Sequence, residues 1–296
     1  MDNLDELFGE VQSRQKETVL QPFDKEAWAS QKQKERAVAY ALIDSTAEKM
    51  KCTGELFQTF LDVQARFDRY SVGNAILITA QKPDATRLAD FDKWKEAGAF
   101  VNKGAVGITV LEPGSEYARE DGSTGVSYNA KKVFDISQTN SKADPALTVT
   151  RDERLMLKAL ISNAPCEMKV SENLSEHLNA LYKPDEKTIL VRKGMDGPSI
   201  FRAISQELAH ARMDGGDYRR SECANAAYCV SYILCKRCGV STDGMFFRQM
   251  PEQYTKMDTK DFRAELGKIR SIANEITAEI NRVLENEKRE KKGEAR

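Results

Sequence analysis

Residues 70–113 read YSVGNAILITAQKPDATRLADFDKWKEAGAFVNKGAVGITVLEP, and this stretch sets the architecture of the first half of the chain. Its apolar run over 74–80 predicts a buried helix, which Pro83 ends because proline lacks the backbone N–H that would continue it. A short helix is expected around Trp94. Two glycine turns then lead into a strand over 107–111. Helices followed closely by a strand predict a small α+β domain.

The flanking segments extend this pattern. Apolar residues recur every three or four positions over 33–69, which predicts two amphipathic helices with a break near 52–54. Residues 112–131 are polar and glycine-rich, as expected for a hairpin or a loop, and a second short strand follows at 133–134. Residues 138–153 are polar and contain a proline, so we place a domain boundary there.

The second half of the chain is mostly helical in its pattern. The predicted elements are a helix over 154–163, a strand over 188–192 (TILVR), a helix from Pro198 to Gly215, a helix over 221–238, and a long amphipathic helix over 262–283. The last helix repeats its apolar residues at alternating spacings of four and three. A short coiled coil is one interpretation of that repeat, and packing on the helix's own domain is the one we favour.

A chain of 296 residues exceeds the usual size of one domain, so two domains are expected. The fold class is predicted as α+β. A flexible arm spans 1–30, a small α+β domain spans 31–142, and a mostly helical domain with a short sheet spans 143–260. The C-terminal amphipathic helix and its charged tail occupy 261–296.

Composition limits the function classes. Lysine and arginine number 45 against 46 acidic residues, so the chain is not basic overall and any nucleic-acid surface must be a local patch. The acidic N-terminus lacks a signal-peptide pattern, and no apolar run is long enough for the membrane, so we expect a cytoplasmic protein. Four of the six cysteines crowd 223–238, where we expect reduced, buried thiols rather than disulfides or a structural zinc. His177 is expected at the surface.

The segment 205–216, SQELAHARMDGG, is similar to the zinc-peptidase motif H-E-x-x-H, with Gln206 in place of the first histidine. Residues four apart share a helix face, so Gln206 and His210 should project together. Glu207 lies one position round, where a carboxylate can activate a metal-bound water. The alternative is an ordinary helix that matches the motif by chance.

A zinc site needs a third protein ligand. Glu222, at the start of the next helix, is the favoured candidate, and Asp214 is the alternative on the same helix. Zinc prefers imidazole and thiolate ligands, with carboxylate next, so the amide of Gln206 is a poor substitute. Binding of Zn²⁺ as a cofactor is therefore expected to be weak, and the enzyme assignment stays open.

Three segments carry a resemblance to a known family: YSVGNAILITAQKPDAT, FDKWKEAGAFVNKGAVGITVLEP and VFDISQT. They resemble the N-terminal domain of ArdC-type antirestriction proteins and the related conjugative-transposon and primase domains. The second half resembles the zincin-like metallopeptidase domain of the ImmA/IrrE group, with third-ligand context at Glu222 to Asn225. The resemblance implies a single-stranded-DNA-binding module joined to a peptidase-fold module, on a bacterial mobile genetic element. Gln206 departs from the family motif.

Single-stranded DNA is held by aromatic faces that stack on bases and by cations along the phosphates. Trp94 can serve as such a face, although anchoring its short helix in the core is the role we favour for it. The candidate DNA-binding residues are Arg87, Lys93, Trp94, Lys95, Lys103, Tyr70 and Asn74.

Three functions are compatible with these observations. The favoured one is an ArdC-like antirestriction protein that binds single-stranded DNA and carries a degenerate peptidase domain. The second is an active zinc metallopeptidase that cleaves a protein, with Glu207 as general base and the metal on His210 and Glu222. The third is a scaffold that holds a partner peptide by strand addition along the edge of 188–192.

Overall fold

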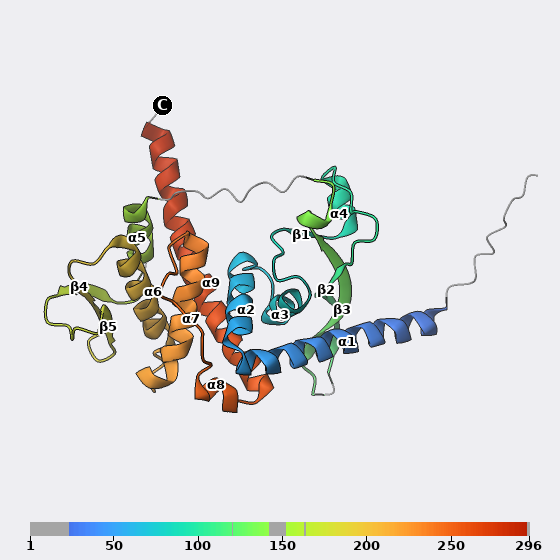
Figure 1. The fold of residues 1–296 in the computed structure, drawn as a ribbon, viewed down its shortest axis with the longest axis horizontal. Coiled ribbons are helices and arrows are strands. Elements are labelled where there is room, and N and C mark those ends of the chain that lie inside the picture. The colour runs from blue at the N-terminus through green and yellow to red at the C-terminus, as the bar shows by residue number, and fades with distance from the viewer. Residues whose placement is uncertain (1–23, 120, 142–151, 163, 295–296) are drawn as a thin grey trace, which may run out of the picture.

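The computed structural model describes residues 24–119, 121–141, 152–162 and 164–294. The fold mixes α and β structure, as predicted, with long helices and two small sheets. Figure 1 shows the N-terminal elements and the β2–β3 hairpin on one side and β4, β5, α5 and α6 on the other, with α7 and α9 between them. None of the helices in the described ranges is long and apolar enough to cross a membrane.

The N-terminal elements follow the predicted order. They are α1 (Lys25–Cys52), α2 (Gly54–Arg66), α3 (Val72–Gln81), β1 (Leu88–Ala89), α4 (Phe91–Glu96), β2 (Ile108–Ala118), β3 (Thr124–Asp135) and a 3₁₀ turn (Ile136–Gln138). The predicted break at 52–54 separates α1 from α2. A Cβ atom on Gly54 would lie 1.5 Å from the carbonyl oxygen of Phe247, so only glycine allows this close approach.

The first sheet has the order β1-β3-β2, and both pairings are antiparallel. The polar segment 112–131 forms most of the β2–β3 hairpin, which is one of the two structures expected for it. Helix α3 packs along β2, while α1 contacts both strands of the hairpin.

The second half adds a sheet and the remaining helices. Its elements are α5 (Glu153–Ile161), β4 (Glu167–Ser171), β5 (Ala180–Lys183), β6 (Thr188–Arg192), α6 (Gly197–Met213), α7 (Arg220–Cys238), α8 (Glu252–Lys256) and α9 (Thr259–Glu294). Strand β6 matches the predicted strand 188–192, whereas β4 and β5 were not predicted.

The position of β6 corrects the scaffold hypothesis. This strand lies in the middle of the sheet, parallel to β4 and antiparallel to β5. Both of its edges are occupied by backbone hydrogen bonds, so it offers no edge to a partner peptide. The expectation of strand addition along 188–192 is therefore wrong.

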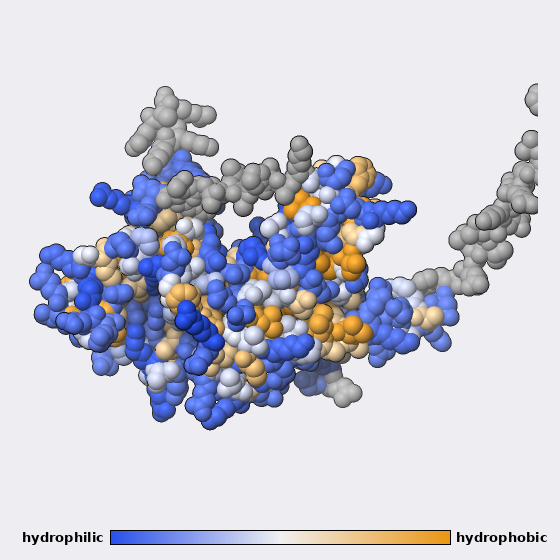
Figure 2. All heavy atoms as spheres, viewed as in Figure 1, coloured by the Kyte–Doolittle hydropathy of each residue, from blue (hydrophilic) through white to orange (hydrophobic). Residues whose placement is uncertain are grey.

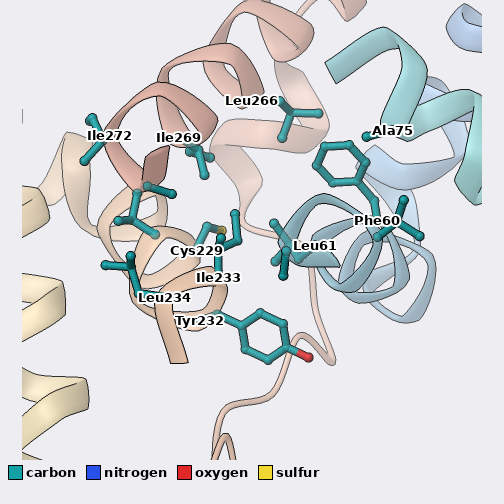
Figure 3. Packing of buried hydrophobic residues seen from close by; sticks show 14 of the residues in the cluster. Phe60, Leu61, Ala75, Cys229, Tyr232, Ile233, Leu234, Leu266, Ile269 and Ile272 are labelled. Atoms are coloured by element: carbon teal, nitrogen blue, oxygen red, sulfur yellow. The ribbon is translucent and has the colours of Figure 1, made fainter. Parts of the chain in front are cut away.

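The hydrophobic core is continuous across the predicted domain boundary at 142/143. Figure 3 shows side chains of α2, α7 and α9 packed together, with Leu61, Ile233 and Leu266 among them. The apolar stripe of α9 is buried in this core. The helix therefore packs on its own chain, as favoured, and does not present this stripe for a coiled coil. All six cysteines lie within the described residues and none of them forms a disulfide, and Cys235 and Cys238 are buried in the same core.

Candidate functional site

Helix α6 carries the motif residues and is well defined at both ends. Asp196 caps its N-terminus by accepting a hydrogen bond from the backbone N–H of Ser199 (2.7 Å), with Pro198 in the first turn. The helix ends just before the Gly215–Gly216 turn, and α7 then packs alongside it. This arrangement brings Gln206, Glu207 and His210 toward the first turn of α7.

Glu207 is almost completely buried, with 3% of its surface exposed, and both of its carboxylate oxygens are occupied. The backbone N–H of Tyr182 donates to Oε2 at 2.7 Å. The guanidinium of Arg220 donates to Oε2 at 2.7 Å and to Oε1 at 2.6 Å, which is a bidentate ion pair. Hydrogen bonds to Glu207 raise the pKa of Arg220 above its ordinary value. Glu207 is thus anchored to strand β5 and to helix α7 at once.

His210 is fully buried next to this ion pair. Its Nδ1 lies 2.9 Å from the hydroxyl of Tyr218, and the two rings meet edge to face. Its Nε2 has no hydrogen-bond partner among the residues that the structure describes. Burial lowers the pKa of His210 to about 4, and the attraction of Glu207 only partly offsets this effect. The imidazole is therefore neutral at pH 7.

None of the remaining predicted ligands is hydrogen-bonded to His210 in the part of the chain that the structure describes. Gln206 is half-buried and lines a cavity of about 360 Å³ together with Glu207 and Arg220. Glu222 is exposed and pairs with Arg219 at 3.1 Å. Across the described part of the chain, no group of three or more histidine, cysteine or acidic side chains is arranged to hold a metal ion.

Asp214, the alternative ligand, is also engaged elsewhere. Its carboxylate accepts a hydrogen bond from the hydroxyl of Tyr182 (2.8 Å) and pairs with Lys187 (2.6 Å). These contacts hold the pKa of Asp214 below its ordinary value, with the Lys187 hydrogen bond as the largest cause. Asp214 therefore ties the end of α6 to β5 and the turn that follows it.

Trp94 lies in a small core with Ala99 and Ile136, and only 2% of its surface is exposed. Its indole N–H donates to the backbone carbonyl of Phe134 at 2.9 Å. The guanidinium of Arg87 lies over its ring, 5.3 Å from the centroid. The ring therefore has no free face on which a base could stack. Trp94 anchors its short helix in the core, and the prediction that it contacts DNA is wrong.

The prediction that Asn74 contacts DNA is also wrong, because this residue is buried, with 7% of its surface exposed. Its Nδ2 donates to the carbonyl of Leu111 (2.8 Å), and its Oδ1 accepts the N–H of Leu111 (2.7 Å). Gln81, two turns along α3, makes the same pair of bonds to Thr109, at 3.0 and 2.9 Å. The two amides take the place of a neighbouring strand along β2. Sequence reasoning overlooked this role of Gln81.

Tyr70 is half-buried and packs edge to face on Phe67. Burial raises the pKa of its hydroxyl above the ordinary value, with the charge of Glu112 adding to the effect. Part of the surface of this residue remains exposed to solvent.

The exposed members of the predicted DNA set surround α4. Arg87, Lys93, Lys95 and Lys103 are all exposed. Two phenylalanines accompany them, Phe91 at 54% exposure and Phe100 at 56%. Figure 2 shows hydrophilic and apolar residues interleaved at the end of the molecule where Figure 1 places α4. We call this set the α4 surface; it consists of Arg87, Phe91, Lys93, Lys95, Phe100 and Lys103.

Phe91 was absent from the predicted DNA contacts. It lies three positions before the buried Trp94 and four before Lys95 on a short helix. An apolar residue directly after the capping Asp90 was the available signal, but the sequence does not show whether such a residue faces the core.

Comparison with known proteins gives two kinds of match. Residues 46–144 match the family model described as the N-terminal domain of anti-restriction factor ArdC. The metal-free crystal structure of the antirestriction ArdC protein from the R388 plasmid superimposes with a TM-score of 0.51 at 18% identity, over 72% of this chain and 86% of that one. The Mn(II)-bound structure of the same protein gives 0.49 at 17% identity, over 72% and 84%.

A comparison with curated protein sequences finds no match. The match to the family model begins within α1 and ends just beyond the 3₁₀ turn. It therefore contains the first sheet (β1-β3-β2), the Asn74 and Gln81 amides and the whole α4 surface. The structural likeness extends the same fold into the second half of the chain. Residues 46–144 are therefore similar to the N-terminal domain of ArdC, and the fold of the chain is like that of the R388 ArdC protein.

Proposed function

We propose that this chain is an antirestriction protein of a bacterial mobile genetic element, and that it acts by binding single-stranded DNA at the α4 surface. The observation that carries the proposal is the pairing of two exposed phenylalanine rings with four exposed cations, within a region similar to the N-terminal domain of ArdC. Exposed rings provide stacking faces for unpaired bases, and the cations provide contacts for phosphates.

The charges around α4 support phosphate binding. Asp90 is the acidic residue closest to the helix N-terminus, and Lys131 neutralises it at 2.7 Å. The hydrogen bond from Lys131 is the largest cause of the lowered pKa of Asp90. Lys93 lies farther from Asp90, at 3.7 Å, and its side chain is mostly exposed. The ammonium groups of Lys93, Lys95 and Lys103 thus remain accessible to a DNA backbone.

Removing either phenylalanine ring is expected to weaken DNA binding. Because stacking contributes about 1–3 kcal/mol per base, Phe91→Ala and Phe100→Ala should each raise the Kd for a short single strand by roughly 5- to 100-fold. Lys95→Ala and Lys103→Ala should each reduce the slope of log K against log salt by about 0.7. Fluorescence anisotropy with a labelled oligonucleotide of mixed sequence measures both effects.

Phe246→Ala is the matched control, since Phe246 is exposed (59%) but lies between α7 and α8. This variant should bind the strand as the wild type does. Wild-type affinity in both Phe91→Ala and Phe100→Ala would remove the α4 surface from consideration. Binding that does not change with salt would remove the phosphate contacts.

A further inference from the structure

A zinc-peptidase site requires three protein donors directed at one point, with the metal supplying the positive charge. The buried Nε2 of His210 has the chemistry of such a donor, and it has no hydrogen-bond partner in the described chain. The other positions do not match it. Gln206 offers a neutral amide, and the carboxylate of Glu222 is exposed and paired with Arg219. The residues present do not fit a zinc ion.

The positive charge beside Glu207 comes instead from the protein. A carboxylate that is 3% exposed needs a counter-charge, because an isolated buried ion is unstable. Arg220 supplies it through two hydrogen bonds of 2.7 and 2.6 Å. The same guanidinium lines the cavity beside Gln206, where it would repel a divalent cation.

We propose that Arg220 takes the place of the metal cation, so that the motif helix is held by an internal ion pair and the site is independent of metal. Glu207 then has a structural role. It accepts hydrogen bonds from the backbone of Tyr182 in β5 and from Arg220 in α7, and so joins both elements to α6. The proposal predicts that Gln206→His alone does not restore a metal site, because Arg220 still occupies the position of the cation.

Metal uptake by the full chain tests the first half of the proposal. The wild type, Gln206→His and His210→Ala are each incubated with excess Zn²⁺, desalted and assayed for zinc by atomic emission. The expected result is no stoichiometric zinc in any of the three. One equivalent of zinc in the wild type or in Gln206→His, lost in His210→Ala, would overturn the proposal.

Thermal unfolding tests the ion pair. Arg220→Met leaves the carboxylate of Glu207 buried without its counter-charge, so the midpoint should fall by roughly 6–10 °C. The double variant Glu207→Gln/Arg220→Met removes the stranded charge and should regain at least half of that loss. The matched control is Arg219→Met, because Arg219 is 75% exposed and pairs with the exposed Glu222, and its midpoint should move by less than about 1 °C.

Two outcomes of the unfolding experiment would overturn the proposal. A double variant no more stable than Arg220→Met would show that the carboxylate is not stabilised by the guanidinium. An effect of Arg220→Met no larger than that of Arg219→Met would have the same meaning. None of these measurements involves DNA, so their outcome is separate from that of the function proposed for the α4 surface.

Discussion

Replacing Asn74 by leucine is expected to lower the free energy of unfolding by about 4 kcal/mol. The amide of Asn74 bonds both the N–H and the carbonyl of Leu111, and all of these groups are buried. Leucine has a similar volume but no polar atoms, so it leaves two buried backbone groups without partners. Each unsatisfied group costs about 1–3 kcal/mol. Urea unfolding followed by circular dichroism measures the loss.

The control for this substitution is Asn129→Leu, because Asn129 is exposed on the neighbouring strand β3. That variant should stay within about 0.5 kcal/mol of the wild type. The folded fraction of Asn74→Leu should still bind single-stranded DNA with wild-type affinity. If the variant instead kept its stability and lost its DNA binding, Asn74 would be a DNA contact and its structural role would be refuted.

Several elements follow from the sequence because their signals are local. The break between α1 and α2 falls where the apolar spacing is interrupted at 52–54, and β6 coincides with the apolar segment 188–192. Helix α6 begins at an Asp cap with proline in its first turn and ends at Met213, two residues before a pair of glycines. Periodicity and capping are properties of neighbouring residues, so a single sequence is enough to read them.

Strands β4 and β5 illustrate what local signals omit. β4 spans Glu167–Ser171, has no buried residue and lacks a clear apolar alternation. It is a strand because it pairs with β6 along its whole length. The pairing partner lies about twenty positions away, and no local pattern specifies it. Because β4 and β5 were not predicted, β6 was expected at the edge of a sheet, whereas it lies in the centre.

The role of Asn74 was misassigned for a related reason. A polar residue in an apolar helix can bind a ligand or satisfy a buried backbone group, and residue type alone does not separate these roles. The spacing offered one clue. Asn74 and Gln81 lie seven apart on α3, so they share a face, and two amides on the buried side of a helix indicate buried partners.

The motif helix shows the same limit at the candidate site. Spacing places Gln206 and His210 together on α6, and both lie there. Arg220 lies thirteen residues after Glu207, and their contact depends on how the turn returns the chain. One signal was present in the sequence: an arginine in the first turn of α7 is unfavourable against the helix dipole, so it requires a compensating partner such as Glu207.

Acidification should destabilise the chain through His210 before the carboxylates protonate. The pKa of this imidazole falls from an ordinary 6.5 to about 4 because the ring is buried. Between these two values the unfolded chain binds a proton at this position and the folded chain does not. Stability from this group is therefore complete above about pH 6.5 and is lost progressively down to about pH 4. The full loss amounts to about 3 kcal/mol.

Urea unfolding at a series of pH values across this window measures the effect. His210→Leu keeps an apolar group in the core and removes the titration, so its stability should change much less with pH over the same range. His177→Leu is the control, because His177 is exposed and is the only other histidine in the chain. It should retain the wild-type pH dependence.

Asp135 should contribute a second loss of stability, at lower pH than the loss through His210. Burial alone would raise the pKa of this carboxylate, but hydrogen bonds from Ser137 and from the backbone of Arg87 and Thr86 outweigh burial and lower it. Its contribution to stability is present above its ordinary value of 3.8 and disappears only below that value. Loss of stability that begins well above pH 3.8 is therefore expected from His210 and not from Asp135. An equal pH dependence in His210→Leu and in the wild type would show that the buried imidazole is not its source.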